Sequence, residues 1–104
     1  MIRPAAVFSD DRVFRYELWR EFNLSNRRYA MVIGLNPSTA DEKKNDPTVT
    51  RCIKFSKLWG CGAFCMTNLF AFRATNTRIM KRQRDPVGQY NDRHLLDVAA
   101  GAKI

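Results

Sequence analysis

One stretch of the chain, Tyr29 to Asp41, joins a short apolar run to a cluster of small polar side chains that could bind a ligand. The apolar part is typical of a strand buried on both faces in the middle of a parallel sheet. Pro37 ends that strand, because proline lacks the N–H of a strand ladder and restricts the residue before it. Open α/β sheets bind ligands just beyond the carboxyl ends of their strands, so this loop is a candidate site. An ordinary turn is the alternative, because Asn-Pro and Ser are common turn residues.

A second apolar run, Ala63 to Phe70, predicts another buried strand, and a helix separates the two strands. The helix begins at Asp46-Pro47, where Asp is a favoured N-cap and Pro a favoured first residue, and it ends at Gly60. A strand–helix–strand unit joins parallel neighbours by a right-handed crossover, and parallel strands end at the same rim. We therefore expect Asn36 and Asn68 to approach the same crevice.

The N-terminal part of the chain predicts a hairpin at the sheet edge, formed by Ala5–Phe8 and Arg12–Glu21. Alternation in the second segment places Phe14, Tyr16 and Leu18 on one face and Arg15 and Glu17 on the other. Farther along, the sequence predicts a short helix over 78–84 and a last helix from about Tyr90 to Gly101. The elements together predict one α/β domain over residues 1–104. Its expected architecture is a three-layer α/β/α fold with a small central parallel sheet that the hairpin extends.

The net charge is +8, with 18 Lys and Arg against 10 Asp and Glu in 104 residues. The commonest physical reason for such a bias in a small domain is a polyanionic partner, although simple solubility is the alternative. Two groups of basic residues could follow a phosphate backbone, or could form solvated faces. They are the helical stripe Arg51, Lys54 and Lys57, and the dense patch Arg78, Lys81, Arg82 and Arg84.

Several classes of protein are disfavoured by the sequence. No apolar run reaches the length of a membrane span, and the start has no signal-peptide core, so we expect a soluble cytoplasmic protein. The three cysteines, Cys52, Cys61 and Cys65, match neither a zinc site nor a redox pair, and reduced buried thiols are expected. His94 lies within the last predicted helix, where a structural role is expected. We predict no metal and no cofactor.

Three stretches carry a resemblance to a family. They are Gly34-Leu35-Asn36-Pro37-Ser38-Thr39-Ala40-Asp41, then Asp46-Pro47-Thr48 with Trp59-Gly60, and then Thr67-Asn68-Leu69-Phe70-Ala71-Phe72-Arg73-Ala74-Thr75. With Asp85-Pro86-Val87-Gly88 and Asn91-Asp92, they resemble a bacterial and phage family known as domain of unknown function 1643. The resemblance covers nearly the whole chain from Phe14 onward. The family implies no settled activity.

A more distant resemblance has mechanistic content. Gly34-Leu35-Asn36-Pro37 after a buried strand is similar to the first active-site motif of mismatch-type uracil-DNA glycosylases. In those enzymes the Asn of this loop positions the hydrolytic water, which implies a catalytic role for Asn36. Ser38 stands where those enzymes usually carry Gly. Thr67-Asn68, followed by Arg73 and Thr75, resembles the segment after their second strand.

This resemblance implies a set of site residues. Asn36 would hold the water, with Asp41 as a candidate base and Asp46 as a second one whose expected role is the helix cap. Substrate would be bound by Gly34, Leu35, Pro37, Ser38, Thr39, Asn68, Arg73 and Thr75. The N-terminus of the Pro47 helix would favour a phosphate.

The resemblance also implies further strands and a second motif beyond Ala102–Ile104, so the chain corresponds to the first two-thirds of a glycosylase-like domain. We expect a DNA glycosylase-like module that acts on or binds DNA bases. A non-catalytic small phage protein that binds nucleic acid or inhibits a host nucleoprotein complex is the alternative, and nucleotide handling is a third. An exposed sheet edge predicts a homodimer or a protein partner.

Overall fold

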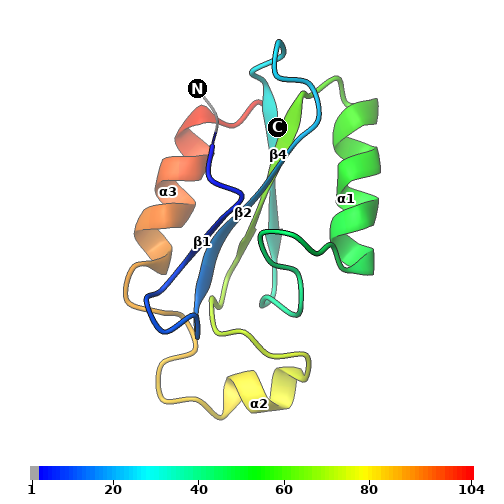
Figure 1. Cartoon of the computed structure of the whole chain (residues 1–104). Helices are drawn as coiled ribbons and strands as arrows, with labels where there is room; N and C mark the ends of the chain where they lie inside the picture. Colours follow the sequence, from blue (N-terminus) through cyan, green and yellow to red (C-terminus); the bar gives the residue numbers. More distant parts are fainter. Residues whose placement is uncertain (1–2) are drawn as a thin grey trace.

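The computed structural model describes residues 3–104 and consists of a four-stranded mixed sheet and three helices (Figure 1). The elements are β1 (Ala6–Phe8), β2 (Arg15–Glu21), β3 (Tyr29–Gly34), α1 (Pro47–Leu58), β4 (Ala63–Asn68), α2 (Thr77–Lys81) and α3 (Asn91–Gly101). The strand order is β1-β2-β4-β3, with β3 parallel to β4 and the other neighbours antiparallel. The predicted hairpin, the parallel pair and the α/β class are confirmed.

The strand predicted to be central lies at an edge of the sheet. All six residues of β4 are buried, whereas β3 forms an edge on which Ile33 is 54% exposed. The apolar run of β3 was consistent with either place, because periodicity does not reveal the number of neighbouring strands. β4 is therefore the central strand of the sheet, and β3 carries the candidate loop at its rim.

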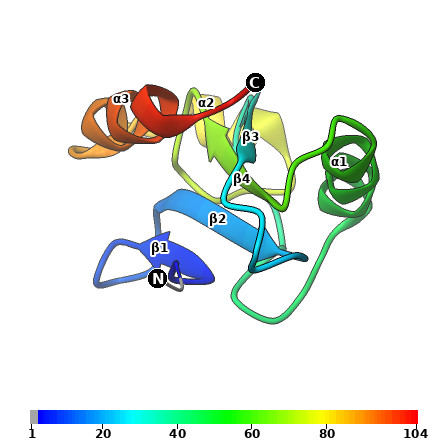
Figure 2. The ribbon, with the colours of Figure 1, turned by 90° about the horizontal axis from the view of Figure 1, so that it is seen from above.

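Alternate residues of β4 belong to two separate cores. Phe64 and Met66 pack with Leu18 and Val49 beneath α1. Ala63 and Cys65 pack with Trp19 and Val98 beneath α3. Because successive strand residues point to opposite faces, α1 and α3 cover opposite faces of the sheet, as Figure 1 and the view from above in Figure 2 show.

A bulge in β2 changes which face its side chains occupy. Val7 pairs with Glu17 and the next residue, Phe8, pairs with Arg15, so Tyr16 is one residue in excess. Tyr16 and Glu17 both contact His94 of α3, whereas Leu18 packs beneath α1. The predicted alternation is therefore wrong at Tyr16. Beyond the bulge, Arg15 turns to the α1 side.

α1 has the predicted start and end. Asp46 is its N-cap and accepts a hydrogen bond from Val49 N at 2.8 Å, and Gly60 follows the helix with φ +80°. Trp59, the C-cap residue, is 49% exposed and stacks on Phe55 with ring centroids 5.9 Å apart.

The C-terminal residues pair with part of the outer edge of β3. Lys103 N donates to Tyr29 O at 2.9 Å, and Met31 N donates to Ile104 O at 3.0 Å. The Tyr29 hydroxyl donates to Val98 O at 2.6 Å and ties this edge to α3. Over residues 3–104, no helix has the length and apolar character needed to cross a membrane.

Candidate functional site

A cleft of about 200 Å³ lies where β3 and β4 end. Six of the predicted site residues line it, namely Gly34, Leu35, Asn36, Pro37, Ser38 and Asn68. Asp46, the second candidate base, also lines it at the start of α1. The structure adds residues from β2, β4 and the first turn of α1, namely Arg15, Met66, Thr48 and Val49. The strand ends predicted to meet thus form one concave site.

The loop after β3 is held beside the segment that follows β4. Leu69 N and Phe70 N donate to the carbonyl oxygens of Gly34 and Leu35 at 3.0 and 2.9 Å, which extends the pairing past the strands. Ala74 N donates to Pro37 O at 2.9 Å, and the Pro37 side chain is fully buried. These bonds give the loop a fixed backbone.

Asn36 has a defined amide orientation. Its Nδ2 donates to Ala74 O at 2.8 Å and to Pro37 O at 3.2 Å. Both partners are carbonyl acceptors, so only the amide nitrogen can face them. The Oδ1 atom makes no hydrogen bond within residues 3–104 and remains an acceptor at a residue that lines the cleft.

Gly34 and Asn68 lie in close contact across the ends of the parallel pair. A Cβ atom at Gly34 would lie 2.8 Å from Asn68 Nδ2, so this position has room only for glycine while Asn68 keeps its place. Asn68 is buried, and Asn91 Nδ2 donates to its backbone oxygen at 2.8 Å. The start of α3 thereby holds the rim of the cleft.

Arg15 is a buried cation at this site that sequence reasoning missed. It is 2% exposed, and its Nη1 donates to Ala40 O at 3.0 Å. Its Nη2 lies 3.4 Å from Asn68 Oδ1, near the limit for a hydrogen bond. Burial lowers the pKa of Arg15 from its ordinary value to about 10, so the guanidinium stays protonated at neutral pH. The bulge at Tyr16 places Arg15 on this face of the sheet, and no pattern in the sequence revealed the bulge.

Asp46 is the carboxylate that lines the cleft. Its Oδ1 caps α1, and its other oxygen makes no hydrogen bond within the part of the chain that the structure describes. Asp41, the predicted base, does not line the cleft. Its Oδ1 accepts from Lys43 N and Lys44 N at 2.9 and 2.8 Å, and these bonds hold the pKa of the carboxyl below its usual value.

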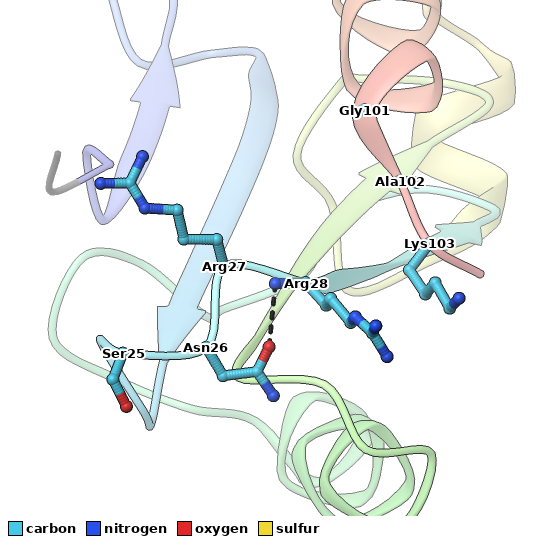
Figure 3. Close-up of a pocket in the computed structure, with 7 residues that line it drawn as sticks. All are labelled: Ser25, Asn26, Arg27, Arg28, Gly101, Ala102 and Lys103. Carbon is cyan, nitrogen blue, oxygen red and sulfur yellow. Dashed lines mark hydrogen bonds between the residues drawn. The ribbon is translucent and has the colours of Figure 1, made fainter.

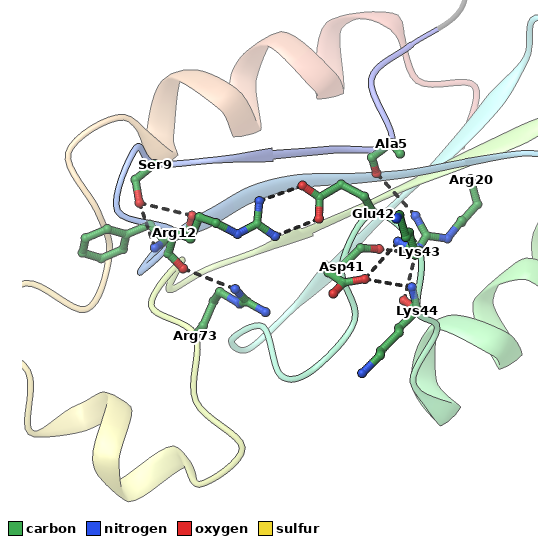
Figure 4. A network of polar contacts seen from close by, with 10 residues as sticks. Ala5, Ser9, Arg12, Arg20, Asp41, Glu42, Lys43, Lys44 and Arg73 are labelled. Atoms are coloured by element: carbon green, nitrogen blue, oxygen red, sulfur yellow. Dashed lines mark hydrogen bonds and ion pairs between the residues drawn. The ribbon is translucent and has the colours of Figure 1, made fainter.

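The loop around Asp41 belongs to a polar network outside the cleft (Figure 4). Arg20 donates to the carbonyl oxygens of Asp41 and Lys44, and Arg12 forms a two-pronged ion pair with Glu42 at 2.7 and 2.8 Å. Arg73 donates to Arg12 O at 3.3 Å and lies over the Phe8 ring. The remaining predicted binding residues, Thr39 and Thr75, are exposed and also lie outside the cleft lining.

The predicted phosphate-binding side chains are exposed on two helices and the turn after one of them. Arg51, Lys54 and Lys57 lie on α1, and Arg78, Lys81, Arg82 and Arg84 lie on α2 and just beyond it. A further basic group was missed. Arg27, Arg28 and Lys103 line an open groove of about 750 Å³ between the β2–β3 loop and the C-terminal residues (Figure 3).

The cysteines and acidic residues offer no metal cluster within residues 3–104, where no three metal-binding side chains of His, Cys, Asp or Glu gather. All three cysteines are free thiols, and two are buried. Burial raises the pKa of the Cys65 thiol, so it is not a nucleophile at neutral pH. His94 pairs with Glu17 and stacks on Tyr16 at 4.8 Å, a structural position away from the cleft.

Comparison with protein families gives a match over residues 15–104 to the family described as "Protein of unknown function (DUF1643)". The chain belongs to the DUF1643 family. The matched region begins at the first residue of β2, so it includes the bulged strand, the cleft and α3. Comparisons with curated proteins and with solved structures find no match.

Proposed function

We propose that this DUF1643 domain is a nucleic-acid-associated, glycosylase-like module that binds, and acts on, a DNA base at the cleft. The observation that carries the proposal is the orientation of Asn36. Its Nδ2 is bound by two carbonyl oxygens, so its Oδ1 is a fixed acceptor beside the cleft. A fixed amide oxygen of this kind can orient a water molecule for attack on a bound sugar.

The chemistry would be hydrolysis of an N-glycosidic bond. Water adds to C1′ of the sugar while the C1′–N bond breaks, and the bonding electron pair leaves with the base. The attacking water loses a proton, and a carboxylate near the water would assist by accepting it. That proton then passes to the departing base. Asp46 fits that role better than Asp41, because Asp46 lines the cleft and has an oxygen without a protein partner among residues 3–104.

The arrangement of the layers agrees with this function. A helix against each sheet face and a motif loop at the carboxyl end of β3 support a three-layer, glycosylase-like fold. The cleft would receive a base that is unpaired or flipped out of the duplex, since a base within the stack cannot reach a concave site. Phosphates on either side would meet the exposed basic side chains of α1 and α2.

Base release from synthetic DNA tests this function. Single- and double-stranded oligonucleotides with normal bases, uracil or mismatches are incubated with the protein, and abasic sites are cleaved with alkali. We expect strand cleavage with the wild type and at least a hundredfold loss with Asn36→Ala, while DNA affinity changes by less than about threefold. Asn45→Ala, in the loop outside the cleft, is the control. Equal release by the wild type and Asn36→Ala would refute the assignment.

A second candidate is a non-catalytic protein that binds nucleic acid or a host nucleoprotein. The favouring observation is that all seven predicted phosphate-binding side chains, and also Arg27 and Arg28, are exposed. In a salt series, this reading predicts DNA binding that weakens steeply with salt and no base release. Affinity that is unaffected by salt would exclude a phosphate contact of this kind.

A protein partner would use the free edge of β3. The C-terminal residues pair with Tyr29 and Met31, whereas Ile33 and Leu35 farther along are 54% and 44% exposed. Exposed edges of this kind pair with a strand of another chain. We expect a homodimer or a bound partner, and sedimentation of a strict monomer at high concentration would exclude the homodimer.

A further inference from the structure

The guanidinium of Arg15 is buried without a carboxylate partner. None of the ion pairs within residues 3–104 includes Arg15, and its Nε atom is buried with no hydrogen-bond partner there. Buried charges in proteins are normally paired and fully hydrogen-bonded, because an unpaired one has lost its hydration without compensation. Arg15 therefore lines the cleft as a buried cation with neutral hydrogen-bond partners, no carboxylate partner and one N–H without any partner.

The first turn of α1 faces the same cleft. α1 has 12 residues, and Asp46, Thr48 and Val49 of its N-terminal end line the space with Arg15. The N-terminus of a helix carries a partial positive charge and favours anions. Arg15 and this helix end thus both contribute positive electrostatic potential to the cleft, and they come from different elements of the fold.

Asp46, Arg20 and Arg73 carry other charges that act on Arg15. Asp46 is the opposing charge, and its carboxylate favours the protonated form of Arg15. Arg20 and Arg73 add positive charge nearby and disfavour that form. Arg15 and Asp46 are the two charged side chains of the cleft lining, so an anion bound there would meet both charges.

We propose that the cleft binds a phosphate group, with Arg15 as its buried cationic receptor. Its volume of about 200 Å³ is below the range of about 300–1,000 Å³ that encloses a whole drug-sized ligand, so it suits a head group and not an entire nucleotide. The planar guanidinium fork matches phosphate oxygens. The phosphate comes from a free nucleotide monoester or from a DNA strand. This inference goes beyond the glycosylase proposal, because it requires binding and no base release.

The first measurement uses the wild-type protein alone. The Nε–H resonance of Arg15 is followed by NMR while sodium phosphate replaces sodium chloride at constant ionic strength. We expect a saturable shift of this resonance, with no change on addition of further chloride. Nucleoside 5′-monophosphates and short oligonucleotides are then titrated, and the ligand that saturates at the lower concentration identifies the source. A resonance that does not respond to phosphate, nucleotide or oligonucleotide would overturn the proposal.

Variants give the second measurement, the rise of the melting temperature with phosphate. We expect Arg15→Met to abolish the rise, and Asp46→Asn to lower its midpoint at least threefold, because the amide keeps the cap and removes the opposing charge. Arg3→Met, whose guanidinium pairs with Glu21 elsewhere, is the matched control and should keep the wild-type midpoint. An undiminished rise in Arg15→Met would overturn the proposal. If Arg15→Met does not fold, a phosphate midpoint that is unchanged in Asp46→Asn would overturn the proposal.

The two proposals can fail separately. Phosphate binding at Arg15 without base release from any oligonucleotide would support the anion site and refute the glycosylase function. Base release that is lost in Asn36→Ala, together with an Arg15 resonance that ignores every phosphate, would support the glycosylase function and overturn the anion site.

Discussion

Replacing Arg15 by methionine should leave the domain as stable as the wild type, or slightly more stable. Burial lowers the pKa of Arg15 from its ordinary value to about 10, and at about 1.4 kcal/mol for each pH unit this shift corresponds to about 3 kcal/mol of unfavourable free energy in the charged side chain. Methionine removes that term. The substitution also removes the bond to Ala40 O, which contributes about 1.5–3 kcal/mol as a bond from a charged donor. The net change lies between zero and a gain of about 1.5 kcal/mol.

Arg20→Met is the matched control on the same strand. The Arg20 guanidinium donates to Asn45 Oδ1 at 2.7 Å and to the carbonyl oxygens of Asp41 and Lys44, so it is well satisfied. We expect this variant to lose about 1–3 kcal/mol of its free energy of unfolding. The same substitution should therefore lower the free energy of unfolding at Arg20 and leave it unchanged or raise it at Arg15.

Urea unfolding in chloride buffer without phosphate measures both effects. Trp19 is buried and reports loss of the core through its fluorescence, and far-UV circular dichroism reports the helices. In thermal unfolding, each kcal/mol corresponds to about 4–8 °C for a domain of this size. A loss of about 2 kcal/mol or more in Arg15→Met, equal to that in Arg20→Met, would refute the reasoning. Arg15 would then be a structural residue whose buried charge is compensated by its surroundings.

Other predictions concern the loops and the edge that frame the site. Gly62→Ala should destabilise the domain by at least about 2 kcal/mol in urea unfolding, because the new Cβ would lie 2.1 Å from a loop carbonyl oxygen; wild-type stability would contradict the packing. Tyr29→Phe should lose about 1–2 kcal/mol in thermal unfolding, because Val98 O loses its buried donor, and an unchanged melting temperature would contradict that bond. Arg12 lowers the pKa of Glu42 from 4.5 to about 2, so the pair is intact above pH 4.5 and is lost as the pH falls through 2. An NMR titration should place the Glu42 midpoint near 2, returning toward 4.5 in Arg12→Ala; equal midpoints would exclude the pair.

Much of the fold could be predicted because local signals agreed with one another. Asp46-Pro47 and Gly60 marked both ends of α1, and the two apolar runs marked the parallel strands on either side of it. The strand–helix–strand topology then required Asn36 and Asn68 to meet, and both line the cleft. These inferences needed only capping preferences and strand direction, which are local or topological.

What could not be predicted depended on register and on tertiary contacts. The bulge at Tyr16 has no residue signature, so simple alternation assigned Arg15 to the wrong face. Asp41 and Asp46 have the same chemistry and lie close in sequence, and only the path of the loop decides which of them lines the cleft. The groove of Arg27, Arg28 and Lys103 joins segments far apart in the chain.

The bulge also affects how other members of the family should be compared with this one. Without Tyr16, Arg15 would directly precede Glu17, and regular alternation would place Arg15 on the face opposite Glu17, which is the α1 side that it already occupies. A single-residue gap in an alignment at this position would therefore leave the cation in the wall of the cleft. The identity of the residue that pairs with Phe8 is thus more informative than the number of residues between the hairpin turn and Leu18. A family member that keeps the arginine but lacks the extra residue should be expected to keep a charged cleft.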